Sequence, residues 1–425
     1  MFTIILTVVK IIAILLEIAI ISIIHDVSTD KTLTCPLSLD PKAKRNATHS
    51  ISVARDKYYK YCNITTLDNS NHSVFPLSSP GVDALYYGTI KVGTPAQPIN
   101  VIIDSGSSDF WFASTSCKNC QTSNILFNPL ISTTFVSTND SWSIEYADRS
   151  FAQGFVAYDT VMISNISIIG QSVEIAINTT ALMENTTING IMGLAFDSLT
   201  HTKGVETPIK SMISQGLINY PVFGLFLGKE SNGTNDSIGN NGGKIHRHFY
   251  EYMYSNNLHV IIFQIEIIFG GYNPDHINGT LIEVPVDNSL GLWEIDIRAT
   301  TAGIEPFIRN IGHFQGVLDT GTTLMLFPSR MATKVAEAYN AIDKKDGTYT
   351  ISCNSSELSP LTFTIGDSDF SIPPADLIYT KDGSSCIAGF GSIDAPFGIL
   401  GDVFLKSHYI IFDHEKPSVY IAPSK

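Results

Sequence analysis

Two aspartates with matching neighbours stand 215 residues apart in this chain of 425 residues. Asp104 ends an apolar run and precedes Ser-Gly-Ser-Ser, and Asp319 ends a second such run and precedes Thr-Gly-Thr-Thr. Each Asp is expected at a strand end, where glycine permits a tight turn and nearby hydroxyls can donate to the carboxylate. A single copy would be an ordinary Asx turn. Two copies predict carboxyl groups that meet and share one proton, because close like charges do not both ionise easily.

Such a carboxyl pair suits the hydrolysis of an amide. The ionised member takes a proton from a water held between the two, and the protonated member polarises the scissile carbonyl. The sequence contains no HExxH zinc motif and no G-x-S-x-G motif that would favour another class of hydrolase. A net charge of −14 makes nucleic-acid binding unlikely, since no excess of cations is present to neutralise phosphates.

A second motif is duplicated in the same order. Gly190-Ile-Met-Gly193 follows Asp104 by 86 residues, and Gly398-Ile-Leu-Gly401 follows Asp319 by 79. Two copies of two motifs predict two homologous lobes. Runs rich in β-branched and aromatic residues predict strands, and helical spacing of apolar residues predicts two helices. The expected fold class is mainly β; the strand runs are 85–92, 99–103, 142–146, 173–177 and 409–412, and the helices are 208–215 and 329–340.

The chain begins with an almost uninterrupted apolar run over 2–24, which indicates a signal peptide or an uncleaved signal anchor. A basic segment over 31–62 carries a net charge of +5, whereas 63–425 carries −17. Eleven Asn-x-Ser/Thr acceptor sites are typical of a protein that passes through the secretory pathway. We therefore expect a secreted glycoprotein, with vacuolar or membrane-anchored forms as alternatives.

Six cysteines agree with an oxidising compartment. Cys117 and Cys120 form a C-x-x-C pattern, which in other settings indicates redox chemistry or half of a zinc site. No second such pattern or His pair completes a metal set, so we expect no metal and favour a local disulfide. Cys353 with Cys386 would be a second disulfide, and Cys35 can pair with Cys62.

Together these motifs resemble the pepsin family of aspartic endopeptidases, most closely the secreted fungal proteases of the rhizopuspepsin type. The resemblance covers about residues 83–425, apart from one stretch. It implies a bilobal fold of two β-barrel-like lobes with the active-site cleft between them, no cofactor, and a monomer that takes extended peptides. The segments that carry it are 86–95, 104–111, 190–197, 319–323, 347–353 and 401–406.

The resemblance also assigns roles to individual residues. Asp104 and Asp319 would be the catalytic pair, and a β-hairpin flap over the cleft would carry Tyr146, whose hydroxyl bonds to Trp111. Closure of such a flap excludes water and positions the peptide. Asp148 and Thr323 would belong to the flap and substrate-binding set. The residues that would support the two catalytic loops are Ser105, Gly106, Ser107, Thr320, Gly321 and Thr322.

Two departures from the family pattern lie in these motifs. Ser105 replaces the usual Thr and keeps its hydroxyl, so activity should survive. The flap reads Tyr146-Ala-Asp148-Arg149-Ser150, where relatives usually have Tyr-Gly-Asp-Gly-Ser. Hairpin tips often require positive φ, which Gly adopts freely and Ala or Arg does not. An Asp at position 148 is associated with accepting Lys beside the scissile bond, and Arg149 would neutralise it, so weakened Lys acceptance is expected.

A third departure is an extra stretch over about 244–265, rich in Tyr, His, Phe and Ile. Its His246, His248 and His259 form only a weak metal pattern. The stretch is either a real insertion, such as a disordered or partner-binding excursion, or a translated intron.

The resemblance divides the chain into a leader (1–25), a basic propeptide (26–75), an N-terminal lobe (83–267) that includes the extra stretch, and a C-terminal lobe (268–425). The propeptide would inhibit its own enzyme: Lys57 or Lys60 would pair with the catalytic carboxylates at neutral pH, and acid would weaken that hold. Three alternatives stay open, namely a solvated basic tail, a catalytically silent peptide-binding relative, and a membrane-anchored processing protease. The mature protein would start between Thr65 and Val82.

Overall fold

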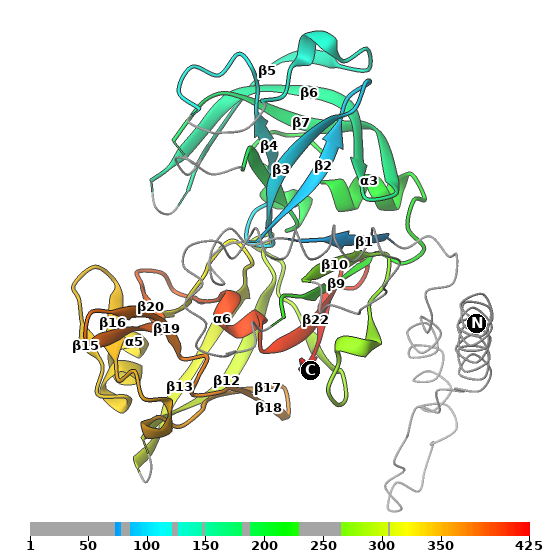
Figure 1. The fold of residues 1–425 in the computed structure, drawn as a ribbon. Coiled ribbons are helices and arrows are strands. Elements are labelled where there is room, and N and C mark those ends of the chain that lie inside the picture. Colours follow the sequence, from blue (N-terminus) through cyan, green and yellow to red (C-terminus); the bar gives the residue numbers. More distant parts are fainter. Residues whose placement is uncertain are drawn as a thin grey trace, which may run out of the picture. The chain divides into compact units, whose positions relative to one another are not determined.

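A computed structural model describes residues 73–77, 86–120, 126–146, 149–180, 188–228, 265–304 and 307–425. The leader, the basic segment up to residue 72, the stretch over 244–264, the Cys35 and Cys62 pairing and Asp148 lie outside these residues. Within them the chain is mainly β, and its strands form three sheets (Figure 1). The expected fold class is therefore confirmed.

The first Asp motif belongs to a seven-stranded sheet with the order β2-β3-β8-β4-β7-β6-β5 (Figure 1). Alternation of buried and exposed residues along β2 shows that one side of that strand faces a core, as period-2 patterning requires. The strands are β2 (Tyr87–Val92), β3 (Gln97–Asp104), β4 (Phe110–Ala113), β5 (Val136–Glu145), β6 (Phe151–Ile163), β7 (Ile166–Thr179) and β8 (Gly190–Gly193).

The second Asp motif belongs to a ten-stranded sheet with the order β15-β16-β20-β14-β21-β13-β12-β17-β18, in which β19 also pairs with β20. Its strands are β12 (Glu294–Ile304), β13 (Phe307–Leu318), β14 (Met325–Pro328), β15 (Ile342–Asp343), β16 (Thr348–Ile351), β17 (Leu361–Ile365), β18 (Ser368–Ile372), β19 (Ile378–Asp382), β20 (Ser385–Ile393) and β21 (Gly398–Leu400).

A third sheet takes strands from both halves of the chain, in the order β1-β10-β9-β22-β23-β11. The expected lobe boundary at 267/268 falls inside β10, which pairs with β1 on one side and β9 on the other. Residues 73–75, which the sequence assigned to the propeptide, lie in β1 of this sheet. The strands are β1 (Ser73–Pro76), β9 (Val222–Phe226), β10 (Glu266–Phe269), β11 (Ile282–Pro285), β22 (His408–Asp413) and β23 (Ser418–Pro423).

Both expected helices are present. In α3 (Pro208–Ser214), Thr207 caps the first turn by accepting from the Lys210 N–H, and Pro208 begins the helix, where its missing N–H costs nothing. The second is α5 (Ser329–Ala338), and a short helix α6 (Asp402–Leu405) follows the second Gly-x-x-Gly motif. No helix among the described residues is long and apolar enough to span a bilayer.

The duplication predicted from the motifs appears as matching strand pairs. In the first copy β3 runs parallel to β8, with Val101 opposite Gly190. In the second copy β13 runs parallel to β21, with Gly316 opposite Gly398. Each Asp strand therefore lies beside the strand that carries its own downstream motif, which explains why the two offsets are similar.

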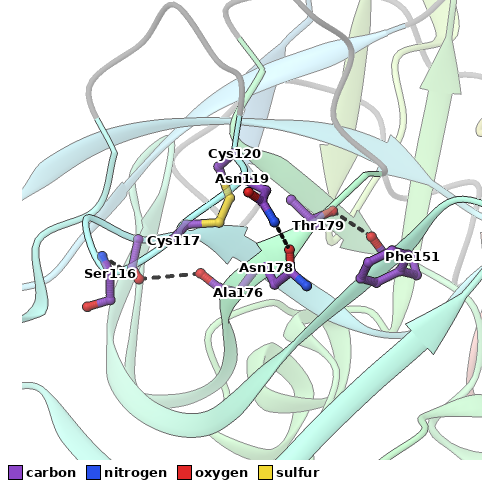
Figure 2. Close-up of a disulfide and its surroundings, with 9 residues drawn as sticks. Ser116, Cys117, Asn119, Cys120, Phe151, Ala176, Asn178 and Thr179 are labelled. Atoms are coloured by element: carbon purple, nitrogen blue, oxygen red, sulfur yellow. Dashed lines mark hydrogen bonds between the residues drawn. A yellow bond between two sulfur atoms is a disulfide. The ribbon is translucent and has the colours of Figure 1, made fainter.

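Two predicted disulfides are present, Cys117 with Cys120 and Cys353 with Cys386. Figure 2 shows the first beside β7, where the Asn119 side chain donates to Asn178 at 2.9 Å. The second joins Cys353, two residues after β16, to Cys386 in β20, and these two strands are paired. Both are local structural links, and no cysteine among the described residues is free.

Candidate active site

Each aspartate is held by the loop that follows its own strand. The Gly106 N–H donates to one Asp104 oxygen at 2.8 Å and the Ser107 hydroxyl donates to the other at 2.5 Å. In the second loop the Gly321 N–H and the Thr322 hydroxyl donate to Asp319 at 2.8 and 2.6 Å. The same short motif thus builds the same carboxylate cradle twice, as the sequence predicted.

The two loops are also joined to each other by hydrogen bonds between Ser105 and Thr320. The Ser105 N–H donates to the Thr320 hydroxyl at 2.9 Å, and the Thr320 N–H donates to the Ser105 hydroxyl at 3.0 Å. Each hydroxyl then donates to a carbonyl of the opposite strand, Leu318 at 3.0 Å and Ile103 at 2.6 Å. Because only the hydroxyl of residue 105 takes part in these bonds, Ser serves here as well as Thr would.

These hydrogen bonds between the loops place each glycine against the carboxylate of the opposite loop. A Cβ placed on Gly106 would lie 2.4 Å from Oδ1 of Asp319, and one placed on Gly321 would lie 2.5 Å from Oδ1 of Asp104. Real Cβ atoms do not approach oxygen so closely. Only glycine fits at these two positions, and its absence of a side chain lets the two carboxyl groups come together.

The electrostatics of the pair follow from this geometry. Asp104 and Asp319 are 7% and 8% exposed, so neither charge is well solvated. Burial and then the charge of Asp319 raise the pKa of Asp104 to about 7, although the bonds from Ser107 and Gly106 favour the ionised form. One proton is therefore retained between the two carboxyl groups in acid. Such a pair can deprotonate a water and donate to a carbonyl oxygen in the same step.

The expected flap is the hairpin of β5 and β6. Near its end the two strands pair in antiparallel register, with Trp142 opposite Gly154 and Glu145 opposite Phe151. At its end the indole N–H of Trp111 donates to the Tyr146 hydroxyl at 2.6 Å. Trp111 is fully buried in β4, and burial raises the pKa of Tyr146, whose hydroxyl stays protonated. The two residues that the resemblance paired are thus joined by a hydrogen bond.

The flap tip is a tight turn with Arg149 in the left-handed region. The Arg149 N–H donates to the Tyr146 carbonyl at 2.8 Å, and the Tyr146 N–H donates to the Ser150 carbonyl at 2.8 Å. Arg149 has a φ of +66°, the conformation that a glycine adopts freely. The positive φ that hairpin tips often require is thus present at Arg149, whereas Ala147 lies outside the described residues. Asp148 lies outside the described residues.

The remaining predicted residue is Thr323, whose carbonyl accepts from the Val403 N–H of α6 at 3.1 Å. Sequence reasoning missed Asp109, Trp142, Glu174 and His201, which are joined around the base of the flap. Two signals were available: an acidic residue inside the motif between Asp104 and Trp111, and a Glu within the apolar run 173–177.

Comparison with known proteins agrees with this geometry. The family model described as eukaryotic aspartyl protease matches residues 85–251 and 240–424, so its two segments overlap where the extra stretch begins. Rhizopuspepsin-3 of Rhizopus niveus is 40% identical over 92% of this chain and 93% of its own length. Syncephapepsin of Syncephalastrum racemosum is 40% identical over 91% of each chain, and mouse gastricsin (Mus musculus) is 31% identical over 81% and 82%. The chain therefore belongs to the pepsin family of aspartyl proteases and is an aspartic-type endopeptidase.

Proposed function

We propose that this protease hydrolyses peptide bonds at acidic pH through Asp104 and Asp319, without a covalent intermediate. The observation that carries the proposal is the pair of buried carboxyl groups in matching cradles, with the pKa of Asp104 raised to about 7. The protonated carboxyl polarises the scissile carbonyl, the ionised one accepts a proton from the attacking water, and the amide nitrogen is protonated as it leaves. No group outside the two loops is needed to move these protons.

The substrate we propose is an extended peptide with bulky apolar residues on both sides of the scissile bond. Tyr146 would lie over it when the hairpin closes, which excludes water from the carboxyl pair. The test is hydrolysis of such peptides between pH 3 and 7, with and without the aspartic protease inhibitor pepstatin. Pepstatin-sensitive cleavage in acid supports the proposal. A chain that binds pepstatin and cleaves nothing would instead be a silent peptide-binding relative.

We further propose that the enzyme is secreted as an inactive precursor. The basic segment over 31–62 (+5) precedes a body of −17, so the two attract at neutral pH, and acid protonates carboxylates and weakens the hold. Because β1 is part of the third sheet, we place the mature start before Ser73.

Acidification of the purified precursor should therefore release a shorter, active chain that keeps residues 73–76. N-terminal sequencing and activity against time follow the conversion. A precursor that stays full-length and inactive at pH 3 would show that the segment is only a solvated tail.

The flap tip also supports a specificity proposal. Arg149 holds a positive φ and follows Asp148, the residue associated with accepting Lys beside the scissile bond. Replacing Arg149 by Gly should raise kcat/KM for Lys peptides relative to Phe peptides, because it removes the neighbouring cation. It should also relieve backbone strain of about 1 kcal/mol. Parallel assays of matched Lys and Phe peptides give the ratio, and an unchanged ratio would mean that Arg149 does not screen Asp148.

A further inference from the structure

A second pair of carboxyl groups, Asp109 and Glu174, lies at the base of the flap. Asp109 is 1% exposed and Glu174 is fully buried. Glu174 is the register partner of Trp111 in the parallel pairing of β4 with β7, so the two residues are neighbours in the sheet. Asp109 lies five residues after the catalytic Asp104. Asp109 therefore lies in the segment that joins the catalytic loop to Trp111, the donor to Tyr146, and Glu174 lies in β7 beside that segment.

Asp109 accepts hydrogen bonds from two parts of the chain, strand β5 and the loop that contains His201. The indole N–H of Trp142 in β5 donates to its Oδ1 at 3.2 Å, and the backbone N–H of His201 donates to the same oxygen at 3.1 Å. Its Oδ2 lies 2.7 Å from Nδ1 of His201, whose side chain is 46% exposed. These three contacts give both oxygens of the buried Asp109 carboxyl a partner, and a buried polar group without one would be costly.

Glu174 is the second carboxyl group of this pair. Neither of its oxygens has a hydrogen bond of ordinary geometry, and both are buried. Burial, then the charge of Asp109 and contact with its carboxyl, raise the pKa of Glu174 to about 10. Glu174 therefore stays protonated beside Asp109, whose Oδ1 accepts from the Trp142 indole N–H.

Two hydrogen bonds now join the segment after the catalytic loop to the flap strand. Trp142 donates to Asp109, and Trp111 donates to Tyr146. The two indole rings also pack together, with centroids 5.9 Å apart. Trp142 and Tyr146 are four residues apart at the end of one hairpin strand, so both lie on the same side of it.

We propose that Asp109, bonded to His201 and neighboured by Glu174, is a positioning residue: it fixes Trp142 and thereby the hairpin that places Tyr146 over the catalytic pair. The proposal rests on the proposed role of this hairpin as the substrate flap. It assigns no reacting proton to Asp109 or Glu174. Their loss should weaken substrate binding and leave the pH dependence of the catalytic pair unchanged.

The test is a double-mutant cycle between Asp109→Ala and Trp142→Phe in the full chain after acid processing. Each change should lower kcat/KM about tenfold, mainly through KM, because each removes the hydrogen bond between Trp142 and Asp109. The double variant should lose little more than either single variant, since both remove the same link. Asp140→Asn, an exposed carboxylate two residues from Trp142 on the same strand, is the matched control and should not change KM.

Two substitutions of Glu174 provide an independent test of the proposal. Glu174→Gln keeps a neutral group that can donate to Asp109 and should retain most of the kcat/KM that Glu174→Leu loses. Additive losses in the cycle, or equal losses in the two Glu174 variants, would overturn the proposal. If Asp109→Ala does not fold, Trp142→Phe and His201→Ala still test the link. A KM within twofold of wild type in both would then overturn it.

An activity-independent measurement separates this proposal from the proposed function. The chain has three tryptophans, and their indole N–H groups donate to Tyr146, Asp109 and the Leu194 carbonyl. Three indole signals are therefore expected in a ¹H–¹⁵N spectrum, and Trp142→Phe identifies its own by deletion. That variant should also shift the Trp111 signal and leave Trp293 unmoved. An unmoved Trp111 signal would overturn the positioning role, even if no peptide is ever cleaved.

Discussion

Replacing Asp104 by Asn is expected to lower kcat/KM for peptide hydrolysis by about 10⁴-fold at every pH. Asn keeps the shape of the carboxyl: its single oxygen can still accept from the Gly106 N–H, and its NH2 group can donate to the Ser107 hydroxyl, so the loop should stay in place. It cannot, however, hold the shared proton or exchange it with a water. Peptide cleavage by the purified variant, measured against wild type and Asp140→Asn, checks this result. Loss of less than tenfold would mean that Asp104 is not one of the reacting carboxyl groups.

The same variant should change how stability depends on pH. The pKa of Asp104 is about 7 in the folded chain and near 3.8 when exposed, so the folded state holds a proton that the unfolded chain releases. That stabilisation is complete below the unfolded value and is lost as pH rises through the folded one. Relative to Asp104→Asn, the free energy of unfolding of wild type should fall by about 3 kcal/mol between pH 4 and 7.

Urea unfolding followed by tryptophan fluorescence, recorded within minutes of mixing, measures this difference at several pH values. Wild type and variant curves that run parallel with pH would show that Asp104 is not protonated in the folded enzyme. The rate of peptide hydrolysis by the wild-type enzyme should also fall as pH rises toward 7, because the carboxyl pair loses its shared proton as pH passes about 7.

How far the sequence predicted this site depends on how local each feature is. The two Asp loops, the duplication and both described disulfides were predicted because their residues lie within short motifs or repeat in order. Hairpin geometry made a positive φ expected at the flap tip, and the structure gives it to Arg149, but the sequence did not say which residue would take it. The set around Asp109 was missed because Asp109, Trp142, Glu174 and His201 come from four segments. These segments meet only when the parallel pairing of β4 with β7 is in place.

The lobe boundary shows a second limit. The sequence placed it at 267/268, but β10 spans that point and belongs to a sheet built from both halves. Around this shared sheet the rings of Phe223 and Phe412 stack with their centroids 4.5 Å apart, and the ring centroids of Trp293 and Phe412 are 5.0 Å apart. A sheet shared by two lobes, here joined where β9 pairs with β22, gives no local signal, since the apolar runs of its strands look like those of any buried strand.

Gly321→Ala and Gly106→Ala should each reduce kcat by about 100-fold, because a displacement of the catalytic groups by an ångström has effects of this size. The added Cβ would meet Asp104 Oδ1 at 2.5 Å in the first case and Asp319 Oδ1 at 2.4 Å in the second, so the two carboxyl groups must separate. Forcing an atom into a packed site should also destabilise the fold by about 1–3 kcal/mol.

The control separates this close approach from ordinary backbone strain. Gly170 has a φ of +64° and no atom within 4 Å of a built Cβ, so Gly170→Ala should cost about 1 kcal/mol of stability and no activity. If Gly321→Ala behaves like Gly170→Ala, with kcat within threefold of wild type, the carboxyl groups tolerate separation and do not act on one shared water. If kcat falls while KM holds, their close contact is required in the reaction itself and not for binding the peptide.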